Sequence, residues 1–185
     1  MNRYYNPVQT IEGAGCAAEL TGLLESMGLA RRNVLLLVWS EAVLDLPAFA
    51  SLTSAGFTIH GQVFRASNPT VEQLFETYQA TRDFAPEAVV AVGGGSIMDV
   101  GKSLCCLYGK ELADADDLRR LIEEKDYGRP SARWIGVPTT AGTGSEVTCW
   151  ATIWDPEKDA KRSVECRENY AFAALVDPEL AAGMP

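Results

Sequence analysis

Four apolar stretches rich in branched side chains recur between residues 34 and 137, and segments with helical spacing separate them. These stretches are Val34–Trp39, Phe57–Phe64, Ala88–Val92 and Trp134–Val137. Short continuous apolar runs are typical of strands that are buried on both faces of a sheet. Their alternation with helical segments predicts a parallel α/β sheet.

The helical spacing predicts five helices around these strands. They are expected at Gly15–Met27, Leu46–Ser54, Thr70–Thr81, Ile97–Tyr108 and Ala115–Glu124. Two of them have recognisable starting signals, Asn68-Pro69-Thr70 and Ser96. Five crossing helices suit a doubly wound, mostly parallel, Rossmann-like three-layer sandwich.

The pattern changes after Pro138. A stretch rich in Gly, Thr and Ser is followed by an extended run at Val147–Trp154, a turn, and a second extended run near Arg162–Cys166. The turn carries Asp155-Pro156-Glu157, so the segment predicts a β-hairpin. Ala173–Val176 has the pattern of one more buried strand.

Composition and charge narrow the class of protein. The chain has 185 residues, of which 47% are hydrophobic, so it can bury one good core. A net charge of -9 argues against DNA, RNA and anionic membranes as partners, because polyanions are repelled. No apolar run reaches the roughly 20 residues of a membrane span, and the start lacks a signal peptide core. We therefore expect a cytoplasmic protein whose five cysteines are reduced and mostly buried.

The first candidate site is a glycine loop between a strand and a helix. Ala88–Val92 runs into Gly93-Gly94-Gly95-Ser96, and the following helix contains Asp99 and Lys102. Residues without a Cβ let backbone amides approach a phosphate, and the helix start adds a favourable dipole. The spacing fits neither the GxGxxG fingerprint nor a P-loop. A tight turn in which Ser96 and Asp99 form a capping box explains the pattern equally well.

A second loop, Pro138–Thr148, follows the next buried strand and is rich in hydroxyl side chains and glycine. Ligands of open α/β sheets bind outside the carboxyl ends of the strands, so the two loops should face one crevice. Hydroxyls suit the amide, ribose and phosphate groups of a cofactor. The alternative is a polar turn that bonds only to itself.

Together these two motifs resemble the iron-containing alcohol dehydrogenases, and the resemblance extends from the first strand to Pro185. It includes Asn68-Pro69-Thr70, Lys161 and Val176-Asp177-Pro178-Glu179-Leu180. In that family an amino-terminal α/β domain binds NAD or NADP. A following all-helical domain holds a divalent metal, iron or zinc, through one aspartate and three histidines. Residues 1–185 would then be the dinucleotide-binding domain, with an α/β core at 1–137 and the second loop, hairpin and final strand at 138–185.

The metal ligands would lie beyond Pro185, and the helical metal domain is expected to be absent from this chain. The single histidine, His60, cannot by itself supply a multi-imidazole site. We therefore predict no metal-ligating residue and no catalytic residue here. Ending on Pro185 suggests a truncated chain, which alone should be inactive.

The resemblance implies roles for particular side chains. Gly94, Gly95 and Ser96 should hold the pyrophosphate, while Asp99 approaches the nicotinamide end. Two further positions should contact riboses: Asn68 near the adenine ribose and Lys161 at the nicotinamide ribose. Threonines should line the adenosine and nicotinamide sides of the cleft, namely Thr139, Thr140, Thr143 and Thr148.

One position bears on the choice between NAD and NADP. Many NAD-preferring relatives have an aspartate where this chain has Ser40, followed by Glu41. A carboxylate there accepts the ribose hydroxyls and repels a 2′-phosphate, whereas serine tolerates the phosphate. Glu41 could replace the missing carboxylate, so the resemblance favours NADP tolerance only slightly.

The intact protein is thus expected to transfer hydride between NAD(P) and a small alcohol or aldehyde. A homodimer is possible, because family members often form dimers through the first strand, but the sequence does not give the oligomeric state. The run from Val147 to Asp155 resembles the phosphonoacetaldehyde reductase branch of the family. Two alternatives remain open. The chain could be an isolated nucleotide-binding module without activity, or a relative of the dehydroquinate synthases or polyol-phosphate dehydrogenases.

Overall fold

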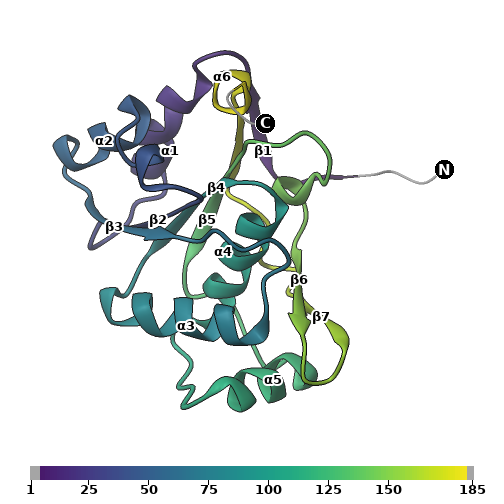
Figure 1. Cartoon of the computed structure of the whole chain (residues 1–185). Coiled ribbons are helices and arrows are strands. Elements are labelled where there is room, and N and C mark those ends of the chain that lie inside the picture. The colour runs from purple at the N-terminus through teal and green to yellow at the C-terminus, as the bar shows by residue number, and fades with distance from the viewer. Residues whose placement is uncertain (1–4, 183–185) are drawn as a thin grey trace.

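A six-stranded parallel sheet lies between two layers of helices in the computed structural model, which describes residues 5–182 (Figure 1). The strands are β1 Gln9–Glu12, β2 Asn33–Val38, β3 Thr58–Val63, β4 Ala88–Gly93, β5 Arg133–Pro138 and β8 Ala173–Val176. Their order in the sheet is β1-β8-β5-β4-β2-β3, and all neighbouring pairs are parallel. The predicted doubly wound α/β architecture is confirmed.

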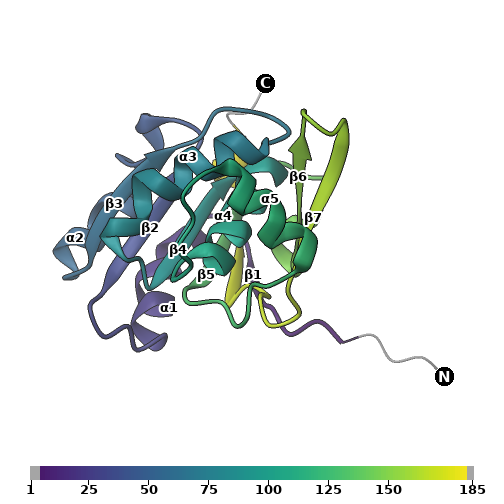
Figure 2. The same ribbon diagram turned by 90° about the horizontal axis from the view of Figure 1, so that it is seen from below.

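Helices cover both faces of this sheet. One face carries α1 (Leu20–Ser26) and α2 (Pro47–Ser54), and the other carries α3 (Val71–Thr81), α4 (Gly95–Leu107) and α5 (Ala115–Glu124). Figure 2 shows α3, α4 and α5 together in front of the sheet. No helix in the described part of the chain is long and apolar enough to cross a bilayer.

The central strands are apolar throughout because both of their faces are covered. In β2, Leu35 and Leu37 face the α3–α5 layer, whereas Leu36 and Val38 face the α1–α2 layer. The four side chains are at most 1% exposed. This period of two within a continuous apolar run is typical of a buried parallel strand.

The predicted hairpin is confirmed as β6 (Trp150–Asp155) and β7 (Ala160–Glu165), which pair antiparallel beside α4. A buried ion cluster holds it against α5. Asp155, which is 0% exposed, accepts hydrogen bonds from Arg119 Nε at 3.1 Å and from Arg162 Nε and Nη2 at 3.0 and 2.9 Å. Burial opposes ionisation, but the hydrogen bonds from the two arginines hold the pKa of Asp155 below its ordinary value.

One strand and one α-helix were not expected from the sequence, and one expected helix differs. Strand β1 is mostly exposed and pairs only with β8 within residues 5–182, so it has no apolar run to reveal it. A short helix, α6, follows β8 at Pro178–Ala181. The expected helix Gly15–Met27 begins as a 3-10 turn at Cys16–Glu19 before α1. Strand β8 lies inside the sheet between β1 and β5, so the segment after residue 138 contributes to the core.

Candidate functional site

The two glycine-containing loops leave the sheet side by side. Gly93 at the end of β4 is the register partner of Pro138 at the end of β5, and the amide of Thr139 donates to the Gly93 carbonyl at 3.0 Å. The chain reaches β3 on one side of β2 and then returns to β4 on the other side, so the strand order reverses between β2 and β4, and the Gly93 loop borders this reversal. Such a reversal is where open α/β sheets bind ligands.

Helix α4 starts on glycine backbone without a side-chain cap. A Cβ at Gly93 would lie 2.5 Å from Ile97 Cδ1, and its φ of 155° is unfavourable for other residues. The N-cap is Gly94, and its carbonyl accepts from the amides of Ile97 and Met98 at 3.1 and 3.2 Å. The amides of Gly95 and Ser96 come before the first amide that forms an intrahelical bond, so they are open to an anion.

The alternative of a capping box at Ser96 and Asp99 is therefore wrong. Ser96 lies inside the first turn, where its Oγ accepts from the amide of Asn68 at 3.1 Å. Asp99 Oδ1 accepts from Ser145 Oγ at 2.9 Å, and Asp99 Oδ2 accepts from the amide of Thr152 at 3.1 Å. Asp99 thus connects α4 to the second loop and to the hairpin.

A cleft of about 370 Å³ opens between these elements. Its lining residues are Asn68, Gly95, Ser96, Asp99, Thr143, Ser145, Thr148, Trp150 and Thr152. Six of them were expected from the sequence, whereas Ser145, Trp150 and Thr152 were not. Ser145 lies within the hydroxyl-rich loop, which was a usable signal, but the hairpin residues gave none because only packing brings the hairpin to α4.

The other expected residues do not line this cleft. A Cβ at Gly94 would lie 3.4 Å from Thr140 Oγ1, so the two loops nearly touch there. Thr139 is buried, and Thr140 lines an adjacent hollow of about 230 Å³. Lys161, on β7, holds its Nζ 4.6 Å from the centre of the Trp154 ring.

Ser40 follows β2, next to the end of β4. Its Oγ accepts from the amide of Ala42 at 3.4 Å and caps a short 3-10 turn. The neighbouring Glu41 forms an ion pair with Arg65, which follows β3. The side chains of this pair are 66% and 65% exposed. The hydrogen bonds to the Glu41 carboxylate, from its own backbone amide and from Arg65, lower its pKa.

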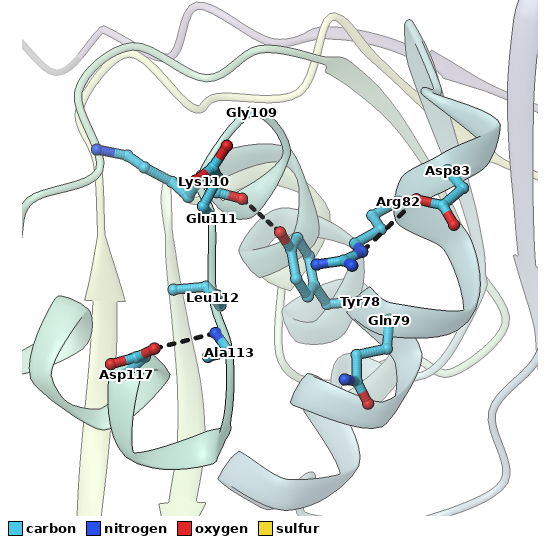
Figure 3. Close-up of a pocket in the computed structure, with 10 residues that line it drawn as sticks. All are labelled: Tyr78, Gln79, Arg82, Asp83, Gly109, Lys110, Glu111, Leu112, Ala113 and Asp117. Atoms are coloured by element: carbon cyan, nitrogen blue, oxygen red, sulfur yellow. Dashed lines mark hydrogen bonds and ion pairs between the residues drawn. The ribbon is translucent and has the colours of Figure 1, made fainter.

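A larger hollow, of about 760 Å³, lies away from this cleft, between the carboxyl-terminal end of α3 and the loop from α4 to α5 (Figure 3). Its polar groups bond mainly to one another. Tyr78 donates to the carbonyl of Lys110, Arg82 pairs with Asp83 at 3.6 Å, and Asp117 accepts from the amide of Ala113 at 2.9 Å. The smaller cleft, with a helix start and a ring of hydroxyls, is the better ligand site.

No candidate metal centre was found in the part of the chain that the structure describes. Residues 5–182 contain no group of three or more His, Cys, Asp or Glu side chains placed to hold one. His60, on β3, lies against the Phe84 ring at 5.2 Å.

Comparison with known proteins gives one family match. The model of the family described as iron-containing alcohol dehydrogenase matches residues 7–178. The chain is 31% identical over 118 residues to the NADPH-dependent butanol dehydrogenase of Clostridium saccharobutylicum, covering 64% of this chain and 30% of that protein. It is 37% identical over 106 residues to the phosphonoacetaldehyde reductase of Streptomyces viridochromogenes, covering 56% and 27%.

Solved structures agree with this match. Sulfoacetaldehyde reductase from Bifidobacterium kashiwanohense, solved in complex with NAD+, superposes with a TM-score of 0.80 at 28% identity. The NADH-dependent butanol dehydrogenase A of Thermotoga maritima gives 0.83 at 21% identity, which supports the fold alone. All of this chain is covered in both cases, but only 48% and 46% of the two solved chains. The chain thus spans less than half the length of these relatives.

Proposed function

Because the chain belongs to the iron-containing alcohol dehydrogenase family, we propose that it is the NAD(P)-binding half of an oxidoreductase. The whole protein would move a hydride between the nicotinamide ring and a small alcohol or aldehyde. The observation that carries this proposal is the meeting of two loops at one cleft. The open amides that begin α4 and the hydroxyls of the second loop border the same cleft, which has a volume of about 370 Å³.

The residues of the cleft fit the parts of a dinucleotide. Two amides, at Gly95 and Ser96, offer donors and the positive end of α4 to a pyrophosphate, which a chain of net charge -9 would otherwise repel. The Thr143 and Thr148 hydroxyls offer neutral partners for the sugar and amide groups. Asp99, which also lines the cleft, would approach the nicotinamide. When bound, that ring supplies or accepts the hydride.

The roles of the surrounding residues remain proposals on the family pattern. Thr139 and Thr140 would border the adenosine side, Asn68 the adenine ribose, and Lys161 the nicotinamide ribose. Lys161 has the weakest support, because it packs over Trp154 outside the cleft. The substrate class follows the names of the relatives, all reductases or dehydrogenases of small aldehydes or alcohols. Homodimer pairing through the edge of β1 is a further part of the proposal.

Titration of the chain with NADH and with NADPH tests the proposal directly. We expect saturable heat in calorimetry and quenching of tryptophan fluorescence, because Trp150 lines the cleft. Added iron or zinc should leave the affinity unchanged. Absence of binding by both nucleotides would refute the role of the cleft. Aldehyde-dependent oxidation of NADPH by this chain alone would contradict the expected lack of activity and would separate a complete enzyme from a binding module.

The surroundings of Ser40 favour NADP. Glu41 could have accepted the ribose hydroxyls of NAD, but its carboxylate is paired with Arg65. An arginine near this position can meet a 2′-phosphate, and serine leaves room for one. We therefore propose that Ser40 permits NADP and that Arg65 lies close enough to support it.

Replacing Ser40 with aspartate should weaken NADPH binding by about tenfold or more, since a carboxylate repels the 2′-phosphate, and should weaken NADH binding far less. Calorimetry with both nucleotides measures the difference. Ser40→Asn is the matched control, because it has the size of aspartate without the charge. Equal losses for the two nucleotides in Ser40→Asp would place the 2′-phosphate elsewhere.

A further inference from the structure

A lysine is buried directly beneath the cleft. Lys102, in the middle of α4, is 1% exposed. Its Nζ donates to Ser145 Oγ at 2.7 Å, to Thr148 Oγ1 at 2.9 Å and to the carbonyl of Trp150 at 2.9 Å. An ammonium has three N–H donors, so these three bonds use all of them.

All three acceptors of this lysine belong to residues that line the cleft, whereas the lysine itself does not. Each hydroxyl that accepts from Lys102 must direct its own proton elsewhere. Ser145 donates onward to Asp99 Oδ1 at 2.9 Å, and Thr148 donates to the carbonyl of Ser145 at 3.3 Å. One ammonium therefore sets both the positions and the donor directions of the hydroxyls on this wall.

The lysine is a poor choice for packing alone. Burial lowers its pKa to about 8, even though the negative charge of Asp99, 3.6 Å from Nζ, acts in the opposite direction. The charge therefore destabilises the folded chain at neutral pH. An apolar side chain would fill the same space without that cost, but it would leave the three acceptors without a donor. Perturbed charges of this kind are concentrated at functional sites.

We propose that Lys102 is a positioning residue, whose three hydrogen bonds hold Ser145, Thr148 and Trp150 in the arrangement that a bound dinucleotide meets. This inference rests on the proposed function, because it concerns the same cleft. It assigns Lys102 no contact with the cofactor. It also explains how a loop rich in glycine and threonine keeps a fixed geometry at its end.

The positioning role predicts an unusual pH dependence. The charged and titratable groups facing Lys102 are Asp99 on its own helix, Glu146 from the second loop, and Cys149 between that loop and β6. Above about pH 8 the neutral amine has only two donors, so one of the three bonds is lost and the affinity for NADPH should fall. Stability should change in the opposite direction. Between about pH 8 and about pH 10.5 the unfolded chain binds more protons at this lysine than the folded chain, so the contribution of Lys102 to stability rises with pH.

Three variants test the proposal. Lys102→Met removes the charge at similar length, and Lys102→Arg keeps a charge at all these pH values. Lys110→Met is the control, because Lys110 lies in the hollow beside the end of α3, away from the cleft. Calorimetry with NADPH should show at pH 7 an affinity about tenfold lower for Lys102→Met than for the wild type, with no further fall at higher pH. Lys102→Arg should also lose the fall above pH 8. Lys110→Met should match the wild type, and circular dichroism should show that Lys102→Met is folded under the conditions of the titration.

The outcomes separate this inference from the proposed function. Failure of the wild-type chain to bind either nucleotide would refute the function. Two results would overturn the positioning role in a wild-type chain that binds NADPH. One is an unchanged affinity in Lys102→Met, and the other is a loss of affinity that partial unfolding of this variant fully explains. A measurement on the wild-type chain tests the proposal even if Lys102→Met does not fold. The sequence has five lysines. In 13C NMR of their ε carbons, one lysine of the wild type should show a pKa of about 8, and this pKa should rise when NADPH binds. Five lysines with ordinary titration would overturn the proposal.

Discussion

Replacing Asp155 with asparagine should lower the free energy of unfolding by about 3 kcal/mol, because it removes the one fully buried carboxylate that two guanidinium groups share and leaves them only with partly exposed carboxylates. Arg119 and Arg162 are 8% and 17% exposed, and both donate to this one side chain. An amide of the same size keeps the volume but not the charge. Urea unfolding at pH 7, followed by circular dichroism, measures the effect.

A surface pair that joins the end of α5 to the same hairpin provides the control. Lys125 and Glu165 lie 3.2 Å apart with side chains 59% and 41% exposed, so Glu165→Gln should change stability by less than about 1 kcal/mol. Equal effects of the two substitutions would mean that the Asp155 cluster adds no more than a surface pair.

The same cluster predicts a loss of stability in acid. The folded-state pKa of Asp155 lies below its ordinary value, so its contribution is fully present above about pH 4 and is lost as the pH falls through the folded-state pKa. Asp155→Asn should lack this part of the acid dependence. Parallel stability curves for the wild type and the variant below pH 4 would contradict the assignment.

Replacing Gly95 with aspartate should reduce dinucleotide affinity by about a hundredfold or more. The added carboxylate would lie at the start of α4, where we place the pyrophosphate, and it would repel the ligand's charge. The structure adds a second cause. A Cβ at Gly95 would lie 3.1 Å from Thr143 Oγ1, so any side chain there pushes against the second loop.

Gly95→Ala separates the two causes, because it crowds Thr143 without adding charge. Its loss of affinity, measured by calorimetry with NADPH, should be clearly smaller than that of Gly95→Asp. Gly22→Ala, on α1, meets nothing within 4 Å and controls for the general effect of a helical substitution. Equal losses in both Gly95 variants would show that the position serves loop packing and not phosphate approach.

The sequence located the loops of the site but not the network that joins them. Gly93-Gly94-Gly95 and the hydroxyls of residues 139–148 each follow an apolar run, so a local pattern reveals both loops. Asp99 was expected to cap its own helix or to meet the nicotinamide. Its bonds to Ser145 and Thr152 span 46 and 53 residues, and no local pattern contains that information.

Lys102 illustrates the same limit. It stands out in the sequence as a charge in an apolar helix, three residues after Asp99. Spacing places the two on one helical face, but it does not show that this face is covered. Burial arises because the second loop and the hairpin close over α4, and burial is what shifts the pKa of the lysine.

By itself, the sequence determined the α/β class, the buried strands and the two loops at their carboxyl ends, because these features depend on periodicity and on glycine within a short stretch of chain. It did not reveal β1, whose exposed edge position leaves no apolar pattern. Only the tertiary structure decided that Trp150 and Thr152 line the cleft, that Arg65 pairs with Glu41, and that Lys102 is buried. Each of these depends on segments far apart in the chain that meet only when the core is packed.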